Sequence, residues 1–190
     1  SQLPEPNEVN YALFKPVIQH QGEVLPAEKS NIRAQTLTDG IAYTESPNLM
    51  NRPRYWENYT NVPWRSPERT KVAIDMQGEH EISRVRFWLD WQRESDAEPT
   101  NTAVIEIVSM TDAACSEAER QQGIDCVELD YVGFRRVAGR SRVELSAAQH
   151  LPSQYVEVDT DLDEAVRYVQ LSWLYLRGVH GNAYLDRGYE

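Results

Sequence analysis

The sequence lacks the features that define membrane proteins and nucleic-acid-binding proteins. It has no uninterrupted run of about 18 apolar residues, the usual mark of a membrane-spanning helix. It carries 30 acidic residues against 19 Lys and Arg residues, a net charge of −11 at pH 7. Such an excess of negative charge repels phosphate backbones and anionic lipid surfaces. Nucleic acid and membranes are therefore not expected partners.

Signatures of catalysis are also missing. The sequence contains no Gly-x-Ser-x-Gly elbow, no His-Glu-x-x-His motif, no phosphate-binding loop and no dinucleotide fingerprint. The carboxylates of Asp159–Glu164 are expected to form an exposed loop before a strand rather than a glycosidase pair. We expect a protein that is not an enzyme, and we keep an unrecognised enzyme as the weakest alternative.

Cysteine is scarce. Cys115 and Cys126 are the only two, and both lie in a polar segment where buried free thiols are unusual. A disulfide between them is favoured over two reduced thiols, and it would contribute roughly 2.5–3 kcal/mol in the chain-entropy model. A disulfide would place the protein in an oxidising compartment.

The sequence shows no internal repeat, no low-complexity tract and no linker. At 190 residues it is long enough for one domain with its own core, and β-sandwiches reach this size as single units. The chain ends at Glu190 without a polar tail. We expect a single domain over residues 1–190 that was excised from a larger protein.

Apolar residues alternate with polar ones, which is typical of half-buried strands. Val85, Phe87 and Leu89 fall on one face, with Arg84, Arg86 and Trp88 on the other. Val72, Ile74 and Met76 alternate in the same way, and Gln77-Gly78 is predicted to turn the chain between these two strands. Further strands are expected at 104–108, 127–131 and 156–158. The nearly continuous apolar stretch 166–176 is expected to be a central strand covered on both faces, with a buried helix as the alternative. A helix is expected only at 112–122, within the cysteine segment.

Several short motifs occur in a characteristic order. They are Asn10-Tyr-Ala-Leu-Phe-Lys-Pro-Val17, Asp39-Gly40, Trp64-Arg65-Ser66, Asp75-Met76-Gln77-Gly78 and Arg167-Tyr168-Val169. In this order the chain resembles the discoidin-like domains, also called coagulation factor 5/8 type C domains. The resemblance implies an all-β fold, a galactose-binding-like jelly-roll β-sandwich, here with one short helical insertion closed by the disulfide.

The resemblance also implies a structural Ca²⁺ ion. In many carbohydrate-binding relatives the aspartate of the Asp-Gly pair and an acidic residue of the last strand ligate calcium together with backbone carbonyls. Asp39 and Asp186 take those positions here, and Thr44 follows as a further candidate ligand. This donor set suits calcium, which prefers six to eight oxygen ligands. The alternative is that Asp39-Gly40 forms a tight turn and binds no metal.

Sugar-binding relatives use aromatic and polar side chains in loops at one end of the sandwich. A planar ring covers the apolar face of a pyranose, and polar side chains bind its hydroxyls. The long aromatic segment 41–63 is the first candidate for such a surface. The candidate ligand-binding residues are Tyr55, Trp56, Tyr59, Trp91, Arg93, His180 and Asn182. Loop packing is the alternative role for Tyr55 and Trp56, and core packing is the alternative for Trp91.

Together these observations predict a non-catalytic carbohydrate-binding module that targets an attached enzyme or its cell to a polysaccharide. The expected location is secreted, periplasmic or on the surface of a bacterial cell. The main alternative is a structural or protein-interaction domain of the same fold that packs against a neighbouring domain. The cluster Arg135, Arg136, Arg140 and Arg142 is read either as solvated decoration of a hairpin or as a patch for an acidic polysaccharide.

Overall fold

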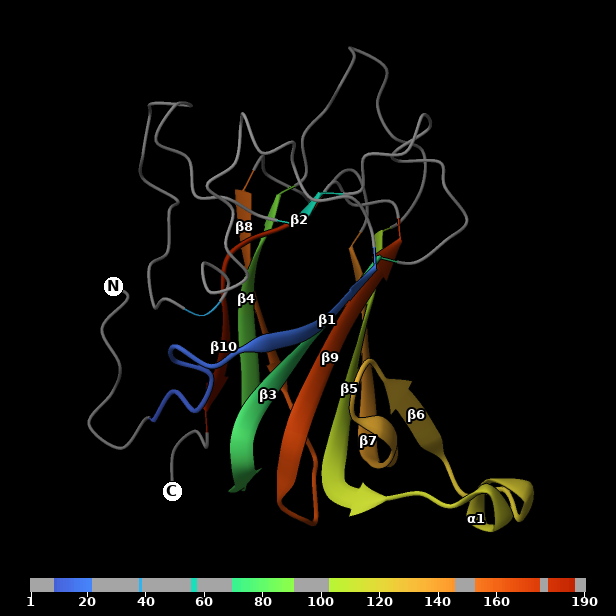
Figure 1. Ribbon diagram of the computed structural model, residues 1–190. Coiled ribbons are helices and arrows are strands. Elements are labelled where there is room, and N and C mark those ends of the chain that lie inside the picture. Colours follow the sequence, from blue (N-terminus) through green and yellow to red (C-terminus); the bar gives the residue numbers. More distant parts are fainter. Residues whose placement is uncertain are drawn as a thin grey trace.

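The computed structural model describes residues 9–21, 38, 56–57, 70–90, 103–145, 153–174 and 178–186, which form two antiparallel sheets and one short helix (Figure 1). In order across the larger sheet, the strands are β1 (Val17–Gln21), β3 (Thr70–His80), β9 (Val166–Leu174), β5 (Ala103–Ala114), β7 (Gly133–Leu145) and β6 (Cys126–Leu129). In the smaller sheet they are β2 (Trp56–Glu57), β10 (Gly178–Asp186), β4 (Arg84–Asp90) and β8 (Ser153–Asp159). The expected all-β sandwich is confirmed.

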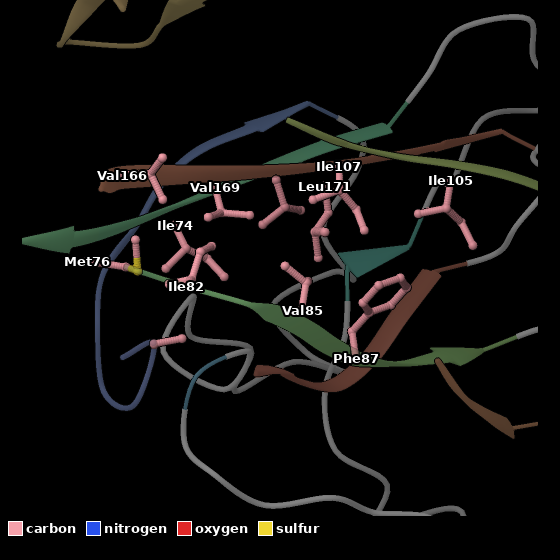
Figure 2. Close-up of a cluster of buried hydrophobic side chains, with 12 residues drawn as sticks. Ile74, Met76, Ile82, Val85, Phe87, Ile105, Ile107, Val166, Val169 and Leu171 are labelled. Atoms are coloured by element: carbon pink, nitrogen blue, oxygen red, sulfur yellow. The ribbon is translucent and has the colours of Figure 1, made fainter. Parts of the chain in front are cut away.

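The main core lies between the two sheets (Figure 2). Most of it comes from residues two apart in β3, β4, β5 and β9, because side chains two apart in a strand share a face. It comprises Ala12, Val72, Ile74, Met76, Ile82, Val85, Phe87, Ile105, Ile107, Val166, Val169 and Leu171. Complete burial of one such side chain contributes about 1.5–3 kcal/mol, so this cluster is the principal source of stability.

A second, smaller cluster covers part of the opposite face of the six-stranded sheet. Ala73, Val108, Met110, Leu129 and Tyr168 form it, and all are nearly inaccessible to solvent. Tyr168 and Val169 are consecutive residues of β9 and belong to different clusters. The prediction that 166–176 contains a central strand covered on both faces is confirmed, since β9 lies between β3 and β5.

The predicted turn at Gln77-Gly78 is wrong. β3 continues to His80, and β3 and β4 belong to different sheets. The glycine marks an irregularity instead, because the register between β3 and β9 shifts between Asp75 and His80. Gln77 adopts a left-handed backbone with φ of 61°, and its N–H donates a hydrogen bond to Asp75 Oδ1 at 2.7 Å.

The predicted helix over 112–122 is also too long. Residues 112–114 belong to β5, and α1 covers only Glu117–Gln121. Ser116 caps it, since its Oγ accepts the N–H of Glu119 at 3.1 Å and donates to the Glu119 carboxylate at 3.2 Å. This reciprocal Ser-x-x-Glu cap is a sequence signal for a helix that begins after Ser116. The Cys115–Cys126 disulfide is present and encloses α1, as predicted.

The strand expected at 127–131 stops at Leu129. Tyr131 lies in the turn between β6 and β7, with φ of 64° and a fully exposed ring. Within the part of the chain that the structure describes, no helix is long and apolar enough to cross a membrane.

Candidate functional site

Three segments far apart in the sequence meet at one end of the four-stranded sheet. β10 begins at this end, with Gly178 paired to Asp90 of β4 on one side and to Glu57 of β2 on the other. The next residue, Val179, pairs with Trp56 and with Leu89. In Figure 1 the short strand β2 lies beside the start of β10. Residues 56–57, 89–90 and 178–179 are therefore neighbours, and Trp91 and Arg93 follow directly in sequence.

The structure places three of the candidate ligand-binding residues. Trp56 belongs to β2 rather than to a loop. His180 and Asn182 were expected in the turn before the last strand, and this position is wrong because both lie inside β10. The strand register shifts between His180 and Ala183, which places Asn182 in an irregular part of the strand. Tyr55, Tyr59, Trp91 and Arg93 lie outside the described residues.

Trp56 and His180 are thus brought to adjacent strands although 124 positions separate them in sequence. His180 pairs with Trp88 of β4, one position beyond the contact between Val179 and Trp56. The expectation that these segments converge at one end of the sandwich agrees with this arrangement. Their role in binding is not tested by it.

The expected calcium ligands are described only in part. Asp39 and Thr44 lie outside the described residues, but Thr38, directly before Asp39, is buried and donates from its Oγ1 to the Lys15 carbonyl at 2.8 Å. Asp186 ends β10 and pairs with Arg84 of β4. Among the described residues no group of three His, Cys, Asp or Glu could hold a metal ion. Calcium binding by Asp39 and Asp186 remains a prediction.

A charged network lies among the strands of the six-stranded sheet. Arg167 of β9 donates from Nε to Asp75 Oδ1 at 2.9 Å and from Nη2 to Asp75 Oδ2 at 3.2 Å. Its Nη1 donates to Asp112 Oδ1 of β5 at 3.2 Å. The hydrogen bonds that Arg167 donates to Asp75 above all, together with the negative charges of Asp75 and Asp112, raise the pKa of Arg167 above its ordinary value. The network ties β3, β9 and β5 together, and we assign it a structural role.

Three arginines of β7 are paired with carboxylates. Arg140 donates from Nε and Nη2 to the two carboxylate oxygens of Asp125, both at 2.8 Å. Arg142 donates to Glu144 at 2.8 and 3.1 Å, and Arg136 contacts Glu119 at 3.4 Å. The hydrogen bond from Arg140 lowers the pKa of Asp125 and raises that of Arg140.

Comparison with solved structures identifies the fold. The chain is similar to a fucose-binding module of Streptococcus pneumoniae, with a TM-score of 0.54, 14% identity, and 98% of this chain and 100% of that chain covered. It is similar to chitosan-binding module 1 of a chitosanase/glucanase from Paenibacillus sp. IK-5, with a TM-score of 0.51, 11% identity, and 93% and 98% covered. It is also similar to reduced XRCC1, solved bound to the catalytic domain of DNA polymerase β, with a TM-score of 0.50, 10% identity, and 94% and 99% covered.

At the level of sequence, no protein-family model and no curated protein matches the chain. Identities of this size establish the fold alone. The chain therefore has the discoidin-like, galactose-binding-like β-sandwich fold of these modules.

Proposed function

We propose that this protein is a non-catalytic carbohydrate-binding module whose sugar site lies where β2, β4 and β10 meet. The observation that carries the proposal is the likeness of nearly the whole chain to fucose-binding and chitosan-binding modules. The pairing of β2 with the start of β10 supports the location, because it brings Trp56 next to the strand that carries His180 and Asn182.

The same comparison supports attachment to an enzyme. The chitosan-binding module is derived from a chitosanase/glucanase. We propose that this chain likewise concentrates a neighbouring catalytic domain, or its cell, on a polysaccharide. Affinity for a single sugar unit is expected to be weak and to gain from neighbouring modules. The disulfide suits an extracellular, periplasmic or cell-surface location.

The test is affinity electrophoresis of the 190-residue chain in gels that contain plant, algal or animal polysaccharides, with calcium and with a chelator. Retardation by one class of polymer is expected. Trp56→Ala should weaken binding about tenfold, equivalent to about 1.4 kcal/mol, because a stacking ring is lost. If Asp39 and Asp186 ligate a structural calcium ion, the chelator will lower both retardation and the melting temperature.

The matched control is Tyr131→Ala. It also removes an aromatic ring, but that ring is fully exposed on the β6–β7 turn of the other sheet. Retardation unchanged in Tyr131→Ala and lost in Trp56→Ala, at equal melting temperatures, supports the proposed site. Equal loss in both variants would contradict its location, and no retardation by any polymer would contradict the function.

A protein-interaction domain is the second candidate. XRCC1 has the same fold and was solved bound to another protein. In this chain the segment before β1 presents Leu13 at 40% and Phe14 at 71% exposure, and Phe14 has a left-handed backbone with φ of 58°. Absence of polysaccharide binding in the electrophoresis would favour this candidate.

A further inference from the structure

The outer face of the six-stranded sheet, which points away from the main core, carries a cluster of polar residues. Residues directly opposite each other on adjacent antiparallel strands share a face. Val108 of β5 lies opposite Gln170 of β9 and Arg140 of β7. Glu106 lies two residues earlier in β5, opposite Arg142 of β7. Val108 belongs to the small outer cluster, which fixes this face as the outer one.

The surface is hollowed at this position. A half-open depression of about 180 Å³ is lined by Glu106, Val108, Arg140, Ser141 and Arg142. Val108 is 4% exposed and supplies an apolar contact in the depression. A cavity of about 150 Å³ accommodates benzene, so this space is large enough for one six-membered ring.

The two arginines are held in place but keep unused donors. A guanidinium has five N–H groups, and the hydrogen bonds to Asp125 and Glu144 use two on each arginine. About half of each side chain is accessible to solvent, 50% for Arg140 and 57% for Arg142. Because the carboxylates already fix these side chains, a ligand would lose little free energy to ordering them.

The net charge of the depression disfavours an anion. Arg140 and Arg142 contribute two positive charges, and three carboxylates surround them: Asp125 and Glu144 through hydrogen bonds, and Glu106 at 3.8 Å from Arg142 Nη1. A phosphate, sulfate or uronate is therefore disfavoured, because the three carboxylates already neutralise the positive charges of the two arginines. A neutral ligand with several hydroxyls can instead accept from guanidinium N–H groups and donate to carboxylates.

Gln170 provides an independent observation. It is 4% exposed, and among the residues that the structure describes its Oε1 has no hydrogen-bond partner. An unpaired buried acceptor of this kind costs about 1–3 kcal/mol and calls for an explanation. Gln170 does not line the depression, but it lies directly opposite Val108, so this buried acceptor shares the outer face with the lining residues and is next to one of them.

We propose that this depression is a second carbohydrate subsite, which binds one neutral pyranose unit of a polysaccharide on the face of the six-stranded sheet. Its ligand class rests on the proposed function, but its residues are separate from those at the end of the four-stranded sheet. A polymer that contacts both sites would gain affinity through effective concentration.

The experiment is NMR titration of the isotope-labelled 190-residue chain with neutral hexoses, and in parallel with galacturonate. Neutral sugar is expected to shift the backbone amides of 105–108 and 140–142, the Nε–H of Arg140 and Arg142, and the side-chain amide of Gln170. Arg142→Ala should abolish these shifts and leave those around β2 and the start of β10 intact. Arg136→Ala is the control, since Arg136 is a similarly exposed arginine of the same strand that pairs with Glu119.

The outcomes separate the two proposals. Shifts only around β2 and β10 that vanish in Trp56→Ala would overturn the second subsite and leave the proposed function standing. Shifts at neither site with any neutral sugar would overturn both. A response to galacturonate but not to neutral hexoses would overturn the ligand class assigned to the depression. Equal loss of the shifts in Arg136→Ala and Arg142→Ala would overturn the assignment of the sugar to the depression, because Arg136 does not line it.

Discussion

Two arginine–carboxylate clusters on the same sheet differ in what surrounds them. Arg167 and Asp75 are shielded, with side-chain exposures of 29% and 12%, and they tie three strands together. Arg140 and Asp125 have a geometry at least as good, but their side chains are 50% and 52% exposed. Burial strengthens a charge pair because less water competes with it, whereas an exposed pair contributes little to stability. The shielded pair therefore serves the fold, and the exposed pair is available to a ligand.

The largest expected effect comes from removing the disulfide that closes the loop next to the exposed cluster. Asp125 directly precedes Cys126, so the disulfide fixes the carboxylate that orients Arg140. The double substitution Cys115→Ala/Cys126→Ala should lower the free energy of unfolding by roughly 2.5–3 kcal/mol. Urea denaturation measures this change, and the Nε–H resonance of Arg140 should broaden while that of Arg167 stays sharp. Chemical reduction of the unmodified protein is the control, and equal stability with and without the disulfide would contradict the prediction.

The second effect contrasts the two aspartates. Asp75→Ala removes both bonds to Arg167 and the acceptor for the Gln77 N–H, which leaves a shielded guanidinium without its main partner. We expect a loss of about 2 kcal/mol. Asp125→Ala should cost about 0.5 kcal/mol, because Arg140 regains water.

Urea denaturation of the two aspartate variants side by side decides the contrast. Equal losses would show that exposure does not separate the two clusters. A larger loss in Asp125→Ala would reverse their assigned roles.

The sequence predicts the sandwich better than its irregularities, for a physical reason. Alternation in Val85 and Phe87 reports which face is buried, and both are indeed fully buried. A local motif such as Gln77-Gly78 is compatible with a turn or with a strand irregularity. Pairing with β9, more than 85 residues later, decides between them. The predicted helix is too long because 112–114 continue β5, where Ala114 pairs with Arg135 of β7, and local helix propensity does not report such a long-range pairing.

The location of the candidate sugar site rests on a different kind of signal. The convergence of residue 56 with residue 180 followed from the resemblance, not from any pattern in the residues. The depression at Val108 was missed, because it depends on strand register that places Arg140 and Gln170 on either side of one valine. The alternate arginines at 140 and 142, in a chain whose other residues are mostly acidic or neutral, were the available signal.

The smallest expected effect is a pH dependence confined to the exposed cluster. The hydrogen bond from Arg140 lowers the pKa of Asp125 in the folded protein, so the pair stabilises the fold above the unfolded pKa of about 3.9. That contribution is lost as the pH falls through the lower, folded pKa. Arg140 stays protonated throughout, and Glu106, the other carboxylate that acts on it, is retained in both proteins compared. Because Asp125 is half exposed, the loss should be at most about 0.5 kcal/mol.

Urea denaturation from about pH 6 to about pH 2.5 should therefore show stability curves of the unmodified protein and Asp125→Asn that converge as the pH falls. Parallel curves would mean that water already screens the pair completely, and a steeper fall in Asp125→Asn would give the pair the opposite sign.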